Sequence, residues 1–352
     1  MAPYFEDLQV GHVERGAPAV TLTGGMAAVH QAIVGDRLAL ALDATLARAV
    51  LGAPAVLAHP ALVWDIAIGQ STLLTGRVIA NLFYRGLVLQ RMPVIGDTLS
   101  TSTEVVALRQ TTPRPGRPAS GLVALRVRTS DQAGRAVLDF WRCAMLPLRD
   151  PDGRTDSEDS FEQIPQELDA GALREASAGW RLDAFVDSRG GERGRLSSSA
   201  PGTRWTADGG DVVSAAPELA RLSLNVAAVH HDRHSHREGR RLVYGGHTIG
   251  LAAAQASRLL PEIVTIAGWH SCEHLAPVHE GDTLYSELEL ERCEPLGEEG
   301  ASGPGALAHL RSRVLAIGER GEGAEEVNEV DDPAGEDGGR PVLDWRFVAV
   351  VA

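Results

Sequence analysis

Hydrophobic residues recur with the period of an α-helix at the start of two stretches of this chain, about two hundred residues apart. In the first stretch the pattern predicts a helix near residues 25–34 and another near residues 61–74. In the second stretch it predicts helices near residues 221–229 and 246–260. Pro261 should end the last of these, because proline lacks the backbone N–H that a continuing helix needs.

Strand-like segments follow the helices in both stretches. Apolar residues there alternate with Thr, Ser and charged residues, as expected for strands with one buried face. Helices first and strands afterwards are typical of an α+β fold with an antiparallel sheet. The predicted strands cover residues 98–108, 121–129 and 136–148 in the first stretch, and residues 283–290, 306–317 and 341–351 in the second.

Three short sequences return in the same order. Gly-Met-Ala-Ala-Val-His at residues 25–30 is echoed by Asn-Val-Ala-Ala-Val-His at residues 225–230. Pro-Val-Ile-Gly-Asp-Thr-Leu, beginning at Pro93, is echoed by Pro-Val-His-Glu-Gly-Asp-Thr-Leu, beginning at Pro277. Val-Leu-Asp-Phe and Val-Leu-Asp-Trp open the final strand of each stretch. The repeat is too long for a solenoid, so we interpret it as a duplicated domain.

The duplication predicts a first domain at residues 1–150 and a second at residues 179–352. Residues 151–178 are rich in Asp, Glu, Ser, Pro and Gly and are interpreted as the linker between them. A second acidic, glycine-rich segment, residues 318–340, is predicted to be a solvated loop.

Composition narrows the class of protein. At 352 residues and 44% hydrophobic content the chain can bury two cores. Its net charge of −14 argues against a nucleic-acid partner, which would need a basic face. No apolar run is long enough to cross a membrane, and residues 1–7 lack the order of a signal peptide. Few, unpatterned cysteines fit a reducing compartment, so we expect a cytoplasmic location (Cys143, Cys272 and Cys293).

The glycine pair Gly245-Gly246 stands where the long helix of the second stretch begins. The first N–H groups of a helix have no internal partner and carry the positive end of its dipole. Glycine allows a ligand to approach this backbone, so the Gly246 N–H is our candidate for holding a developing oxyanion. The alternative is a tight turn that needs glycine only for its backbone angles.

His230 is the candidate acid or base, because histidine exchanges protons near neutral pH. Asn225 precedes it by about a turn and a half of helix and could orient water, a hydroxyl or the imidazole. A purely structural histidine is the alternative, and His30 at the matching place in the first stretch is compatible with it.

The histidines near His230 raise the possibility of a metal site, but neighbouring arginines would repel a cation and the ligand spacing is not that of known zinc sites. Arginines instead suit an anionic ligand. The sequence also lacks the nucleophile elbow, the phosphate-binding loop and the dinucleotide fingerprint. The residues concerned are His231, Asp232, His234 and His236, with Arg233, Arg237, Arg240 and Arg241.

Taken together, these motifs resemble the MaoC-like acyl dehydratases, which are hot-dog proteins that hydrate enoyl-CoA thioesters reversibly. The family motif Asp-x-Asn-Pro-x-His-x-Asp falls on residues 225–232. His230 and Asp232 are kept, whereas Asn225 replaces the usual catalytic aspartate. Leu-Val-Tyr-Gly-Gly-His at residues 242–247 and the opening Tyr-Phe-Glu-Asp-Leu-x-Val-Gly are similar to the double hot-dog subfamily of mesaconyl-CoA hydratases, or β-methylmalyl-CoA dehydratases.

The resemblance implies a tandem hot-dog with a degenerate first copy and one active site, in the second half. His230 would move the proton, Asn225 would hold water and Gly246 would stabilise the enolate, with Asp232 or His247 assisting. The substrate would be a branched dicarboxylyl-CoA, no cofactor would be needed, and a homodimer is possible. Residues implied in substrate binding, including the CoA phosphates, are Tyr244, Gly245, His247, Arg240 and Arg241.

Two other functions remain open. A tailoring dehydratase of the same fold would act on a carrier-protein thioester. A non-catalytic acyl-CoA-binding protein would explain why Asn225 stands in place of an acid.

Overall fold

The computed structural model describes residues 2–53, 55–191, 194–235, 239–296, 305–318 and 339–352. Its centre is a single 12-stranded sheet in which every described strand pair is antiparallel. The main path runs β1-β4-β5-β6-β3-β9-β12-β11-β10-β7, while β2 pairs with β4 and β8 with β10. The α+β class with an antiparallel sheet is therefore confirmed.

The order of strands repeats on the two sides of the sheet's centre. The first half contributes β3 (Ala80–Leu89), β4 (Thr98–Gln110), β5 (Ser120–Ser130) and β6 (Ala136–Pro147). The second contributes β9 (Ile263–His274), β10 (Thr283–Pro295), β11 (Ala306–Ile317) and β12 (Arg340–Val351). Short strands complete the edges: β1 (Val13–Glu14), β2 (Val20–Thr21), β7 (Arg204–Thr206) and β8 (Asp211–Val212).

The two halves join where β3 pairs with β9, with Tyr84 opposite Cys272 and Leu87 opposite Trp269. The sequence did not predict either of these strands. Most of β9 is buried, and its sequence, an apolar start followed by His-Ser-Cys-Glu-His, lacks the regular alternation of a half-exposed strand. The chain that follows β6 covers part of this centre, since a Cβ on Gly268 would lie 2.9 Å from Leu168.

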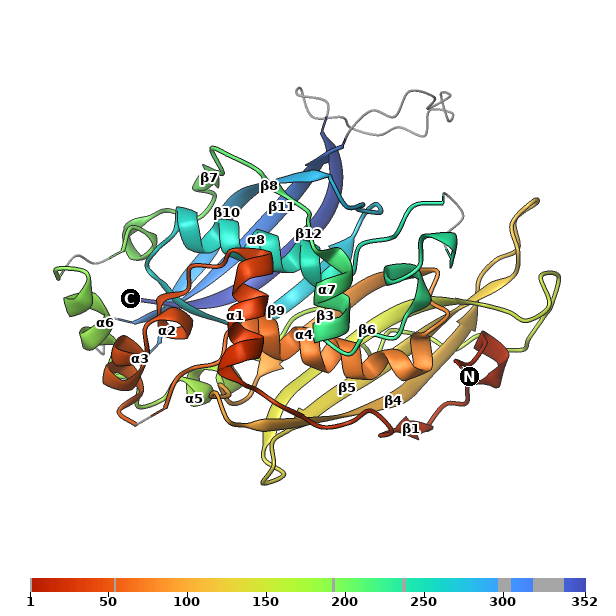
Figure 1. Cartoon of the computed structure of the whole chain (residues 1–352), viewed down its shortest axis with the longest axis horizontal. Helices are drawn as coiled ribbons and strands as arrows, with labels where there is room; N and C mark the ends of the chain where they lie inside the picture. The colour runs from red at the N-terminus through yellow and green to blue at the C-terminus, as the bar shows by residue number, and fades with distance from the viewer. Residues whose placement is uncertain (1, 54, 192–193, 236–238, 297–304, 319–338) are drawn as a thin grey trace.

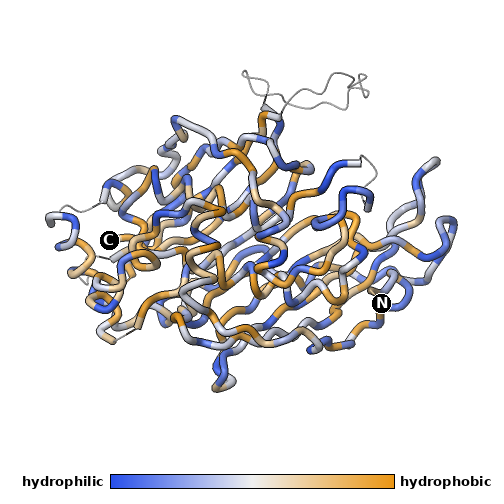
Figure 2. The backbone as a smooth tube through the Cα atoms, viewed as in Figure 1, coloured by the Kyte–Doolittle hydropathy of each residue, from blue (hydrophilic) through white to orange (hydrophobic). Residues whose placement is uncertain are grey.

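A long helix from each half lies against one face of the sheet (Figure 1). These are α4 (Pro60–Gln70), which continues into the 3₁₀ turn η2 (Ser71–Thr75), and α8 (Gly245–Leu259). Every residue of α4 is buried. Trp64 of α4 meets Trp269 edge-on, with ring centroids 4.8 Å apart, so helix and sheet share one aromatic core. Figure 2 shows hydrophobic stretches along these helices and strands, whereas many loops are hydrophilic.

Helix α1 (Gly24–Val34) confirms the first predicted helix, with Thr23 capping its start and Gly35 its end. Smaller elements surround it: α2 (Ala39–Leu42), α3 (Ala44–Leu51), α5 (Ala170–Ala176), α6 (Leu182–Ser188), α7 (Ala216–Leu222) and the 3₁₀ turns η1 (Phe5–Asp7), η3 (Leu196–Ser198), η4 (Ala228–His230) and η5 (Arg233–Ser235).

The helix predicted at residues 221–229 is wrong, because α7 ends at Leu222. Leu224 has a φ of 60°, the left-handed conformation of a residue just past a helix end. The Asn225 N–H donates to the Ala220 carbonyl at 3.0 Å and the Leu224 N–H to the Arg221 carbonyl at 3.1 Å. These two bonds form a Schellman motif, which turns the chain and places Asn225.

The segment predicted to be a linker is partly folded. Ile164, Leu168 and Leu173 are buried, and the last of these belongs to α5. The Leu168 N–H donates to His270 Nδ1 of β9 at 3.3 Å, which ties this segment to the sheet. Most of the acidic segment at residues 318–340 lies outside the described residues.

Candidate active site

A pocket of about 350 Å³ opens between the two halves of the molecule. The first half lines it with residues of α4, η2, β3 and β6, and the second half with the turn around η4, the start of α8 and the end of β9. Its polar lining side chains are Thr72, Asn81, Tyr84, Arg142, Asn225, His230, Tyr244, Thr248 and His274.

His230 lies in this pocket at the end of η4 and is buried. Its Nδ1 is 2.9 Å from the Leu242 carbonyl oxygen. A carbonyl can only accept, so Nδ1 carries the proton and Nε2 of the neutral ring has a free lone pair. Burial lowers the pKa of His230 to about 4, the Leu242 carbonyl opposes this, and the charges of His231 and Arg142 lower it further. The ring is therefore a neutral proton acceptor at pH 7.

Asn225 lines the same pocket, held by the Schellman motif and by its own hydrogen bonds. Its Oδ1 accepts from the Ala227 N–H at 2.9 Å, and its main-chain oxygen accepts from His231 Nε2 at 2.6 Å. The side-chain oxygen is thus engaged, which leaves the NH₂ group to face a ligand. Asn225 can donate a hydrogen bond in this pocket but, unlike aspartate, cannot take a proton.

The glycine pair opens α8 at the pocket wall. Neither Gly245 nor Gly246 has a positive φ, so the need for unusual backbone angles does not explain them. A Cβ on Gly245 would lie 2.5 Å from His274 Nε2, and a Cβ on Gly246 would lie 2.1 Å from Asp65 Oδ1. Glycine is required here because other groups approach the backbone closely. Neither N–H forms a hydrogen bond among the described residues, as is usual for the first turn of a helix, so the Gly245 N–H can serve an oxyanion in the pocket.

Of the two glycines, Gly245 lines the pocket, whereas Gly246 is buried behind it. Tyr244 also lines the pocket, and its hydroxyl donates to the Asp65 carbonyl at 3.5 Å. Burial raises the pKa of the Tyr244 phenol well above its usual value. The Tyr244 phenol therefore stays neutral, and the side chain lines the site as a hydrogen-bonding group.

Four other predicted site residues do not lie in this pocket. Asp232 is exposed and accepts hydrogen bonds from the His234 N–H and the Ser235 hydroxyl, so it shapes the turn η5. Arg241 donates to Glu280 at 2.7 Å, and Arg240 is exposed. His247 is fully buried, and neither of its ring nitrogens has a partner among the described residues.

No group of three or more His, Cys, Asp or Glu side chains within the described ranges is placed to hold a metal ion. His236 and Arg237, which belong to the histidine-rich segment, lie outside those ranges. The three cysteines are unpaired, and two of them are buried.

Sequence reasoning missed the first half's contribution to the site. From the first half, Arg142 on β6 and Asn81 on β3 line the pocket. From the second half, His274 at the end of β9 lines it and was also not predicted. Burial lowers the pKa of His274 to about 4, so this ring is also neutral at pH 7. One signal was available: Arg142 interrupts an otherwise apolar run in a predicted strand, where a cation is rarely buried without a reason.

Paired and aromatic side chains occupy the equivalent place around the first half's histidine, His30. His30 lies 3.1 Å from Asp65 with both side chains buried, and His59 contacts Asp36. Aromatic side chains of the sheet also fill space near His30's side of the molecule, as the strand pairs show. Arg142 stands opposite Tyr84 in the β6–β3 pair, whereas Phe347 stands opposite Trp269 in the equivalent β12–β9 pair. Two buried aromatic rings thus occupy positions that face the open pocket in the other half.

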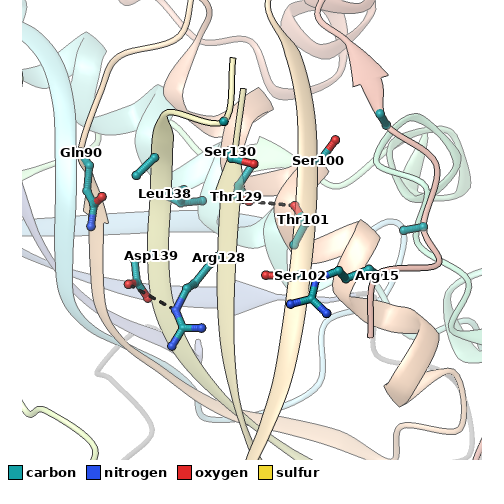
Figure 3. A pocket seen from close by; sticks show the side chains of 14 residues that line it. Arg15, Gln90, Ser100, Thr101, Ser102, Arg128, Thr129, Ser130, Leu138 and Asp139 are labelled. Carbon is teal, nitrogen blue, oxygen red and sulfur yellow. Dashed lines mark hydrogen bonds and ion pairs between the residues drawn. The ribbon is translucent and has the colours of Figure 1, made fainter. Parts of the chain in front are cut away.

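A second hollow, of about 510 Å³, lies along β4, β5 and β6 of the first half (Figure 3). Two pairs of its polar side chains contact each other: Thr101 and Thr129 at 2.8 Å, and Arg128 and Asp139 at 4.0 Å. It contains none of the predicted site residues. We therefore place the candidate chemistry in the pocket between the halves.

A fold of two fused units, each wrapping a sheet around a long helix, with a histidine-containing pocket at their joint, defines a double hot-dog protein of the acyl-dehydratase type. Curated relatives narrow the class. Mesaconyl-CoA hydratase of Cereibacter sphaeroides is 31% identical over 322 residues, covering 89% of this chain and 89% of the relative. β-Methylmalyl-CoA dehydratase of Chloroflexus aurantiacus is 28% identical over 325 residues, covering 90% and 88%.

Comparison with solved structures identifies the same fold. A conserved hypothetical protein of Mycobacterium tuberculosis with a double hot-dog fold is 48% identical, with a TM-score of 0.85 over 99% of this chain and 98% of that one. A putative MaoC-domain dehydratase of Chloroflexus aurantiacus is 26% identical, with a TM-score of 0.75 over 99% and 97%. No family model matches the sequence. The chain belongs to the mesaconyl-CoA hydratase family of double hot-dog hydro-lyases, which confirms the predicted fold and resemblance. None of the described helices is long and apolar enough to cross a membrane.

Proposed function

We propose that this chain adds water reversibly to the double bond of an α,β-unsaturated acyl-CoA thioester, in the pocket between its halves. The observation that carries the proposal is the free Nε2 of His230, which shares the pocket with the NH₂ group of Asn225 and the start of α8. A base, a water-holding donor and an oxyanion site thus come together in one cavity.

In the hydration direction Asn225 holds water and His230 Nε2 takes one of its protons. The water oxygen bonds to the β-carbon, and the π electrons of the double bond move onto the thioester oxygen. The Gly245 N–H, at the start of α8, stabilises that enolate oxygen. The protonated His230 then returns its proton to the α-carbon, so one imidazole acts as base and then as acid. A histidine whose pKa is about 4 is a strong proton donor once it is charged, which suits this second step.

The mesaconyl-CoA and β-methylmalyl-CoA named for the relatives indicate a branched dicarboxylyl-CoA as the substrate. The test follows absorbance of the enoyl-thioester band after mixing the purified chain with mesaconyl-CoA, with crotonyl-CoA, and with crotonyl-acyl carrier protein. We expect loss of the band with mesaconyl-CoA. Turnover of the carrier-bound ester alone would instead identify a tailoring dehydratase.

The assignment of residues is tested by His230→Gln and Asn225→Ala. We expect His230→Gln to lower kcat by at least ~10²-fold, the usual contribution of a general acid–base, with the unfolding midpoint unchanged. Asn225→Ala should raise KM and lower kcat by a smaller factor. Tight binding of CoA esters with no turnover by the unmodified chain would favour the non-catalytic alternative.

Three further proposals concern the domain limits, the number of chains per active site and the cellular location. We place the domain limits at residues 150 and 178, expect one chain to hold a complete site, and expect a cytoplasmic location. Limited proteolysis would test the limits, and light scattering would show whether a homodimer forms.

A further inference from the structure

Arg142 is a buried cation in the pocket, with 3% of its surface exposed. Three hydrogen bonds fix its guanidinium: Nε to Asn81 Oδ1 at 3.1 Å, Nη1 to the Ser71 hydroxyl at 2.7 Å and Nη2 to the Thr75 hydroxyl at 3.2 Å. All three acceptors are neutral. No acidic side chain of the described residues forms an ion pair with Arg142.

A buried charge without a counter-ion is costly, so proteins normally pair it. Guanidinium has five N–H groups, and the three bonds leave one on each terminal nitrogen. Two such donors in a rigid fork match a carboxylate. The Asn81 side-chain nitrogen, which is also buried and has no partner among the described residues, adds a third donor beside them.

The duplication shows that the fold itself does not need this cation. Arg142 comes three residues after Asp139 on β6, and Phe347 comes three residues after Asp344 on β12. The same place in the sheet therefore accepts a phenyl ring in one half and a guanidinium in the other. Arg142 lines the pocket, whereas Phe347 does not.

We propose that Arg142, fixed by Asn81, Ser71 and Thr75, is the receptor for a carboxylate on the acyl chain of the substrate. This deepens the proposed function, because it assigns the preference for a dicarboxylyl thioester to one side chain. A CoA phosphate does not fit this place. The long pantetheine arm keeps the phosphates far from the thioester, whereas Arg142 lines the same pocket as His230, deep in the joint of the halves.

The experiment compares mesaconyl-CoA with crotonyl-CoA, which lacks the second carboxylate, in the unmodified chain and in Arg142→Met. Both kcat/KM and binding by calorimetry are measured, together with binding of free CoA. Arg126→Met is the matched control, because Arg126 pairs with Asp139 at 2.8 Å and does not line the pocket.

We expect Arg142→Met to lower kcat/KM for mesaconyl-CoA by at least ~30-fold, as for loss of a charged hydrogen-bonded pair, and to leave crotonyl-CoA within about threefold. Equal losses on both substrates in a folded variant would overturn the proposal, and so would equal preference for them in the unmodified chain. Weaker binding of free CoA would assign Arg142 to a phosphate and also overturn it.

If the unmodified chain turns over neither thioester, the proposed function fails. Calorimetric binding of the two thioesters then still tests whether Arg142 receives the carboxylate. Tighter binding of mesaconyl-CoA that disappears in Arg142→Met would support it, and equal binding would refute it. If Arg142→Met does not fold, Arg142→Lys replaces it. Lysine keeps the charge without the fork, so we expect about a tenfold loss on mesaconyl-CoA alone.

Discussion

The imidazole of His247 is a buried polar group whose removal should stabilise the protein. Its side chain is fully buried in α8, and both ring nitrogens lack a partner among the described residues. An unsatisfied buried polar group costs ~1–3 kcal/mol, so His247→Leu, similar in volume and apolar, should raise the free energy of unfolding by about this amount at pH 7.

The increase in the free energy of unfolding that His247→Leu brings should be larger at acidic pH. Burial lowers the pKa of His247 from 6.5 to about 4. Below pH 6.5 the unfolded chain therefore takes up a proton that the folded chain refuses, and stability falls as the pH drops from 6.5 towards 4. Integrating between these two pKa values gives a loss of ~2 kcal/mol at pH 5 from this one ring. A leucine escapes that loss.

Urea unfolding at pH 7 and pH 5 measures both contributions, and His247→Gln separates them. Glutamine does not titrate but remains a buried polar group, so it should gain only at pH 5. A leucine variant that is less stable than the unmodified chain at pH 7 would show that His247 has a partner we have not identified. An equal gain at both pH values would refute the argument from protonation.

Two further predictions concern the site. The acid limb of kcat/KM should lie near pH 4, because the base His230 is protonated only there; an inflection near 6.5 would contradict burial as the cause. Gly69→Ala should destabilise the fold by ~1–3 kcal/mol or more, since its Cβ would lie 1.7 Å from the Ser223 backbone oxygen. It should also slow hydration by displacing Asn225, whereas Gly25→Ala, with Thr23 Oγ1 3.8 Å from the new Cβ, should do neither. Retained stability and rate in Gly69→Ala would count against this account of how Asn225 is held.

Much of the fold could be predicted from sequence because the signals are local. The repeated motifs gave the duplication, and the alternation of apolar and polar residues gave the six outer strands. Helix α8 was predicted within one residue at each end, since glycines open it and Pro261 follows it.

The errors arise where tertiary contacts override local pattern. The apolar sequence after Leu222 looks helical, but the left-handed turn at Leu224 packs against the helix carrying Gly69 and cannot be read from periodicity. Strands β3 and β9 were not predicted because they lie at the centre of the sheet. The site was predicted only in part for the same reason: His230 and Asn225 sit in a recognisable motif, whereas Arg142 reaches them through strand pairing across the molecule.

Because both halves contribute side chains to one pocket, a first copy that lacks the motif of the second can still take part in the site. In our proposal the second half supplies the base, the water-holding amide and the helix start, and the first half supplies Arg142, which lines the same pocket. At the related position the roles are reversed and the space is filled: His30 is paired with Asp65, and Phe347 stands where the cation would be. On this proposal the first half is more than a structural support, because it contributes a charged side chain to the pocket. The proposal thus gives each half a distinct role, with Arg142 on the one side where a cation would meet the carboxylate of the substrate.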